Sequence, residues 1–178
     1  FVPAVYGRQD VLLQDRGLEF SLFIGEWFEG FNEFHIARDP SAGRNRICVW
    51  DPAKGNYFLS LKQEKEVYRK AAGILTFYYN LYTFEQIFSW HHAAGDFIVN
   101  VGPEDIDVRL VTVRQYISLF ENQKPDAALI PEALLIFLLN LSLRMRLDRY
   151  EGVGEIVWSD DAAVEGTLIG FFEGLAIN

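Results

Sequence analysis

The chain has 178 residues, of which 50% are apolar and 15% aromatic, and its formal net charge is −9. This length suits one domain, and this apolar content excludes a disordered chain. The negative charge argues against a nucleic-acid partner held by phosphate contacts and against an anionic membrane surface. Cys48 is the only cysteine, which excludes an intrachain disulfide and favours a reducing, cytoplasmic location.

No charged start followed by an apolar segment and a cleavage site is present, so the sequence shows no signal peptide. The longest apolar run, residues 133–139, ends at Asn140. It is shorter than the roughly 20 residues that a membrane span needs, so we expect no membrane partner. We expect one domain over residues 1–178, and the start at Phe1 leaves open that it is a fragment of a longer chain.

The first half of the chain alternates between strand and helix patterns. Weakly alternating apolar residues in Leu18–Phe28 predict a strand. A hairpin is predicted from about 46 to 61, because the turn-forming residues 51–56 separate two β-like runs. From Lys62 the apolar residues recur at helical spacing, which predicts a helix over 62–80.

The second half repeats this alternation. Short helical turns are expected over Thr83–Phe88 and Gln115–Phe120. Between them, Asp96–Val101 and Asp107–Val113 are β-like and predict the clearest hairpin in the chain. The helix predicted over 131–149 is apolar nearly all round, so we expect it to be the central buried helix.

A last helix is predicted after a cap at Ser159 or Asp160. The side chains expected to be buried on it are Val164, Leu168, Phe171, Phe172 and Leu175. Because no internal repeat or linker appears, the elements together predict one α+β domain, rich in helix, with short antiparallel hairpins.

One segment carries residues that are suited to catalysis. His91 and His92 lie beside Trp90 and shortly before Asp96. Histidine titrates near neutral pH, and a nearby carboxylate can orient it or share a metal ion. His91, His92 and Asp96 are therefore the candidate catalytic residues. The alternative is that one histidine is exposed and the other hydrogen-bonds a loop carbonyl. The isolated His35 suggests a structural or surface role.

Read in chain order, these elements resemble the kinase-like fold of aminoglycoside and choline phosphotransferases. Phe1–Gly7 and Leu18–Ile24 resemble the two strands that end the small lobe, and Glu26–Phe31 resembles the hinge. His92–Val99 is similar to the end of the catalytic loop, and Asp107–Val113 resembles the strand that should carry a metal-binding Asp. The similarity covers about the first two thirds of the chain.

The resemblance implies a large-lobe-like fold that holds ATP and magnesium. It implies that Glu26, Trp27 and Phe28 meet the adenine ring, and that Asp96 replaces the metal-binding Asn and ligates Mg²⁺. His91 takes the position of the catalytic Asp, and Thr112 takes that of the second metal-binding Asp and lies in the cofactor site.

Two functions therefore follow from the sequence. The first is a degenerate or truncated kinase-like domain that binds a nucleotide or a related small ligand, with catalysis left open. The alternative is a non-catalytic interaction module whose aromatic surface binds a protein partner or a second copy of the chain.

Overall fold

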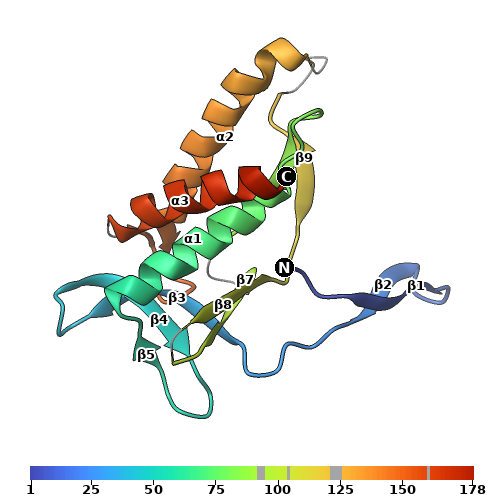
Figure 1. Ribbon diagram of the computed structural model, residues 1–178. Helices are drawn as coiled ribbons and strands as arrows, with labels where there is room; N and C mark the ends of the chain where they lie inside the picture. The colour runs from blue at the N-terminus through green and yellow to red at the C-terminus, as the bar shows by residue number, and fades with distance from the viewer. Residues whose placement is uncertain (92–94, 104, 121–125, 160) are drawn as a thin grey trace.

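The computed structural model describes all residues except 92–94, 104, 121–125 and 160, and its described part is of the α+β class (Figure 1). Its strands are β1 Val5–Leu13, β2 Leu18–Gly25, β3 Asn32–Asp39, β4 Arg44–Trp50, β5 Tyr57–Phe58, β6 Glu85–Phe88, β7 Phe97–Val101, β8 Ile106–Leu110, β9 Gln115–Ser118, β10 Leu147–Arg149 and β11 Ile156–Trp158. The described strands pair as a sheet of order β5-β4-β3-β7-β8 and as three two-stranded sheets, β1–β2, β6–β9 and β10–β11.

The helices are α1 Leu61–Phe77, α2 Ile130–Met145 and α3 Ala162–Ile177, and a 3₁₀ turn, Ala127–Leu129, precedes α2. Helix α1 begins at a capping box, in which the Ser60 hydroxyl accepts from the Gln63 amide and the Gln63 side chain accepts from the Ser60 amide. Its buried apolar side chains pack with those of the central sheet in one core.

The predicted hairpins and the predicted α1 are confirmed. β4 pairs with β5, and β7 pairs with β8 in register from Phe97↔Leu110 to Val101↔Ile106. The two predicted short helices are wrong, since Glu85–Phe88 and Gln115–Ser118 form paired strands. Each run is too short to show a period, and their pairing joins residues about 30 positions apart, which local pattern cannot reveal.

Helix α3 lies along α1 (Figure 1), and the closest contacts between them are made by small residues. Of the side chains predicted to be buried on α3, Phe171 is buried. Gly166, Gly170 and Gly174 are buried, whereas Leu168 and Phe172 are exposed. A Cβ at Gly166 would lie 2.5 Å from the Lys65 carbonyl oxygen, and one at Gly174 would lie 2.6 Å from the Cβ of Thr76. The glycines therefore let the two helix backbones approach closely, which turns Leu168 and Phe172 outward.

Helix α2 is not the central buried helix that its composition predicts. Only one face is buried, at Ala133, Phe137, Leu141 and Met145, and the helix ends before β10 begins. The helical segment Ala127–Met145 is long and apolar enough to cross a membrane by length and composition. The helix continues past the apolar run 133–139, because a polar residue such as Asn140 does not end a helix.

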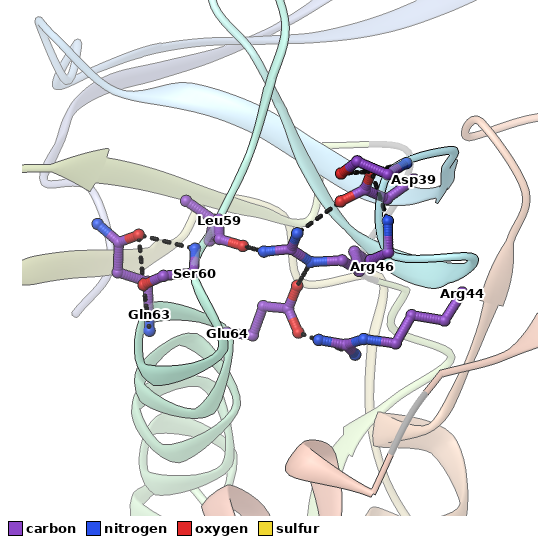
Figure 2. Close-up of polar contacts among 9 residues, drawn as sticks. Asp39, Arg44, Arg46, Leu59, Ser60, Gln63 and Glu64 are labelled. Atoms are coloured by element: carbon purple, nitrogen blue, oxygen red, sulfur yellow. Dashed lines mark hydrogen bonds and ion pairs between the residues drawn. The ribbon is translucent and has the colours of Figure 1, made fainter.

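A buried ionic network ties the start of α1 to the sheet (Figure 2). The Arg46 guanidinium donates to Glu64 at 3.0 Å, to Asp39 at 2.5 Å and to the Leu59 carbonyl oxygen. Glu64 also meets Arg44, at 3.7 Å. Hydrogen bonds from the Ser41 and Arg46 side chains lower the pKa of Asp39 to about 2. Since every charge here has a partner, the network is structural.

His35 is buried in β3, opposite Cys48 in β4, and its ring contacts the Trp50 ring with centroids 3.6 Å apart. Burial lowers the pKa of His35 to about 4, so the side chain is neutral at pH 7. Within the described residues its Nε2 has no hydrogen-bond partner. Of the two roles expected for His35, structural or surface, its burial excludes the surface one, and Cys48 is buried beside it.

Candidate functional site

An open pocket of about 1050 Å³ lies beside the central sheet. One wall is the connection between β2 and β3, and the other walls are the start of β3, the β4–β5 loop and the β7–β8 pair. Its described lining is Pro3, Val5, Phe23, Gly25, Glu26, Trp27, Phe28, Phe31, Asn32, Glu33, Trp50, Pro52, Asn56, Gly95, Ile98 and Val111. This volume is typical of sites for drug-sized ligands and cofactors.

The connection between β2 and β3 supplies the aromatic wall. Phe28 and Phe31 pack with ring centroids 5.4 Å apart, and the Arg109 guanidinium lies over both rings, at 5.6 and 6.0 Å. Trp27 is 88% exposed and has its ring free for a ligand. Trp50, at the end of β4, adds a second indole on the other side of the lining. Rings of this kind offer flat surfaces on which a ligand ring can stack.

The polar groups of the pocket are acidic or neutral. The Glu26 carboxylate accepts from the Ala4 amide at 3.1 Å, which fastens the strand entry to the connection. Glu33 is the second residue of β3. Its carboxylate lies against Gly95, because a Cβ added to Gly95 would be only 3.1 Å from the Oε1 atom of Glu33. Asn32 and Asn56 add amide groups to the lining. The lining therefore combines aromatic stacking surfaces with hydrogen-bond acceptors.

Asp96 lies behind this pocket and is fully buried. One carboxylate oxygen accepts from the His91 amide at 2.8 Å, and the other accepts from the Arg114 guanidinium at 2.8 Å. Burial raises the pKa of Asp96, and its hydrogen bonds and Arg114 oppose that rise. The Asp96 carbonyl oxygen also accepts from the Val111 amide at 2.8 Å. In this arrangement Asp96 anchors the entry to β7 against the exit of β8.

The structure brings only some of the predicted site residues together. Glu26, Trp27 and Phe28 line the pocket, whereas His91, Asp96 and Thr112 are not among its described lining residues. The Thr112 hydroxyl lies 3.5 Å from the Gly95 carbonyl oxygen. His92 lies outside the described residues. Within the described part, no three His, Cys, Asp or Glu side chains gather as a metal site would require.

Glu33 and Trp50 line the pocket but were not among the predicted site residues, whereas Phe31 lies in the segment that resembles the hinge. Trp50 ends a strand, and the next residues, Asp51 and Pro52, open a turn. A large ring at such a point, where the chain leaves a sheet, was the signal that could have marked it. Glu33 carried no signal, because its neighbour Gly95 is 62 positions away in the sequence.

A second surface feature is the β1–β2 hairpin, which stands apart from the helices (Figure 1). Its register places Arg8, Asp10 and Ser21 on one face, where the Ser21 hydroxyl donates to Asp10 at 2.5 Å. The other face carries Gln9 and six apolar side chains, those of Val11, Leu13, Leu18, Phe20, Leu22 and Ile24. Apart from Val11, these apolar side chains are 40–70% exposed.

Comparisons with protein-family models, with curated proteins and with solved structures found no match for this chain. We therefore infer function from the pocket, from the hydrogen bonds of Asp96 and from the β1–β2 hairpin.

Proposed function

We propose that this chain is a kinase-like domain that binds a small ligand with a flat ring system in the aromatic pocket. The observation that carries the proposal is the meeting of two distant segments there. Glu26–Phe31, which resembles a hinge, faces Gly95, Ile98 and Val111 across one volume of about 1050 Å³. In a kinase-like domain, these are the segments between which a nucleotide base binds. Trp27 and Trp50 are the rings on which such a base would stack.

The arrangement around Asp96 bears on catalysis within this proposal. Both carboxylate oxygens already accept hydrogen bonds, one of them from Arg114. For Asp96 to ligate Mg²⁺, Arg114 would have to turn away and leave a buried pair, which costs several kcal/mol or more. Ligand binding without phosphoryl transfer is therefore the function that this geometry supports best, with ATP and Mg²⁺ as the ligands implied by the resemblance.

The test is thermal melting with ATP and Mg²⁺, with adenosine, and without ligand, followed by titration of tryptophan fluorescence. A ligand that binds only the folded chain raises the melting temperature once its concentration exceeds Kd. We expect a saturable shift that is lost in Trp27→Ala. Tyr82→Ala is the matched control, since Tyr82 is 82% exposed and outside the pocket lining. No shift with any of these ligands at millimolar concentration would refute the proposal.

A second candidate function, association with a second copy of the chain, is favoured by the apolar face of the β1–β2 hairpin. A two-stranded hairpin is marginally stable alone, so this one gains from being covered. The five apolar side chains of this face that are 40–70% exposed offer on the order of 500 Å², so two such faces would bury about 1,000 Å², the lower limit of biological interfaces. Residues 5–25 hold two Arg and three Asp or Glu, a charge of −1, compared with −9 for the chain. Two copies could therefore meet here with little repulsion.

Sedimentation over a range of chain concentrations tests this second candidate. We expect a monomer–dimer equilibrium that Phe20→Lys shifts to monomer. Leu12→Lys is the matched control, because Leu12 is exposed in the same hairpin but lies on its opposite face. A chain that stays monomeric at every concentration, or an equal effect of both variants, would refute association through this face.

A further inference from the structure

The aromatic pocket contains negative but no positive side chains in its described lining. Its ionisable lining residues are Glu26 and Glu33, and no Lys, Arg or His is among the described residues that line it. The same connection carries Glu29, so residues 26–33 hold three glutamates and no basic residue. A ligand phosphate in this pocket would therefore meet carboxylates at short range in a chain whose net charge is already −9.

The two glutamates are available to a ligand. Among the described residues, the Glu33 side chain forms no hydrogen bond or ion pair that would neutralise it. Glu26 accepts from the Ala4 amide and also has no cationic partner in the described part of the chain. Both are exposed to solvent at the pocket, so a ligand could replace water around them without breaking an existing ion pair.

The nearest described cations are engaged elsewhere. Arg109 lies over Phe28 and Phe31 and pairs with Asp107 at 2.7 Å, and it is not part of the lining. Lys54, on the β4–β5 loop, lies 3.9 Å from Asp51. Lys54 carries a point charge and not the fork of donors that a phosphate group commonly binds, and the Arg109 fork is held over the two rings, outside the described lining.

We propose that the pocket prefers small organic cations to nucleoside phosphates, and this proposal rests on the proposed ligand site. The cations are ones in which a flat ring is joined to an ammonium group. The ring would stack against Trp27 or Trp50, and the ammonium group would lie between Glu26 and Glu33. Indole faces attract cations as well as rings, so the aromatic and acidic parts of the lining favour the same ligand class. This preference is opposite to that expected of an ATP site, in which positive groups meet the phosphates.

The test uses three ligands that share one base and differ only in charge at the 5′ position. They are 5′-amino-5′-deoxyadenosine, adenosine and AMP, titrated into the whole chain by calorimetry at low and high salt. We expect the amine to bind at least tenfold more tightly than AMP, with adenosine between them, and we expect added salt to narrow the difference.

Glu33→Gln should weaken the amine by about tenfold, leave adenosine nearly unchanged and strengthen AMP. Glu29→Gln is the matched control, because Glu29 lies in the same connection but outside the described lining, and it should change the three affinities by less than twofold.

The outcomes separate the two proposals. If AMP binds as tightly as the amine, or if Glu33→Gln and Glu29→Gln act alike, the charge preference is refuted and the ligand site stands. If adenosine, AMP and the amine all fail to bind at millimolar concentration, the ligand site itself is refuted, and the charge preference falls with it.

Discussion

The α1–α3 layer and the β1–β2 hairpin differ in how closely they are packed: the helices are in close contact, whereas the apolar side chains of the hairpin are largely exposed. Between α1 and α3 the backbones approach so closely that glycine is the residue that fits at Gly170, where a Cβ would overlap the Arg69 carbonyl oxygen. At Gly7 in the hairpin, a Cβ would meet nothing within 4 Å. Stability therefore resides in the helical layer and its sheet, while the hairpin is a surface that is held in place by few contacts.

The largest expected effect comes from the buried network that anchors this layer. Arg46→Met would leave Asp39 and Glu64 buried without their shared partner. Breaking a buried pair in this way costs about 3–5 kcal/mol. We therefore expect the free energy of unfolding, measured with urea, to fall by about this amount.

The hairpin offers the matched control for this change. Arg8 and Asp10 form an exposed pair at 3.5 Å, and such pairs contribute about 0–1 kcal/mol. If Arg8→Met destabilised the chain as much as Arg46→Met, the assignment of stability to the helical layer would be wrong.

Gly170→Ala should follow, at about 3 kcal/mol, because the added methyl group forces α3 away from α1. The measurement is again the free energy of unfolding, with circular dichroism to show that helix content is kept. Gly7→Ala in the hairpin is the control and should change stability by less than about 0.5 kcal/mol, since its Cβ has open space. A mild effect at Gly170 would mean that α3 can shift along α1.

These two layers also show what the sequence could and could not predict. The hairpins around residues 51–56 and 102–105 were predictable because turn residues separate β-like runs. The helix α3 and the burial of Phe171 were predictable, but the rest of its buried face was not. Gly166, Gly170 and Gly174 recur at helical spacing, and so do the large apolar residues, so either set could form the buried face. The close approach of α1 selects the face with the glycines.

The site was predictable in the same uneven way. Glu26, Trp27 and Phe28 are adjacent in sequence, so a local resemblance was sufficient to place all three together in one lining. The pairing of Asp96 with Arg114 was not predictable, because the two residues are 18 positions apart and carry no local signal of contact. Whether a carboxylate is free or paired depends on tertiary contacts, which one sequence does not contain.

The pH dependence of stability tests the core around His35. In the folded chain burial lowers the pKa of His35 from 6.5 to about 4, so below pH 6.5 the unfolded chain takes up the proton more readily. The stability that neutral His35 provides is complete above pH 6.5 and is lost as the pH falls towards 4. At pH 5 the loss should be roughly 2 kcal/mol relative to pH 7.5.

His35→Leu removes this titration and supplies the comparison. Asp96, whose pKa is raised by burial, acts in the opposite direction, because its protonation on acidification favours the folded chain. It is present in both proteins, so it cancels in the difference between the two pH profiles. Equal slopes between pH 7.5 and 5 would show that His35 is protonated in the folded chain.

The smallest effect is expected in the hairpin itself. Phe20 is 44% exposed on the apolar face, so Phe20→Ser should change the free energy of unfolding of the monomer by less than about 0.5 kcal/mol. Amides of β1 and β2 should also exchange hydrogen well before those of α1, because a hairpin with few buried contacts opens without global unfolding. The opposite result would be a loss of unfolding free energy as large as that of a core substitution, and one that grows with chain concentration. Such a result would mean that the apolar face is covered in solution, so that the contrast between the two regions holds only for the isolated chain.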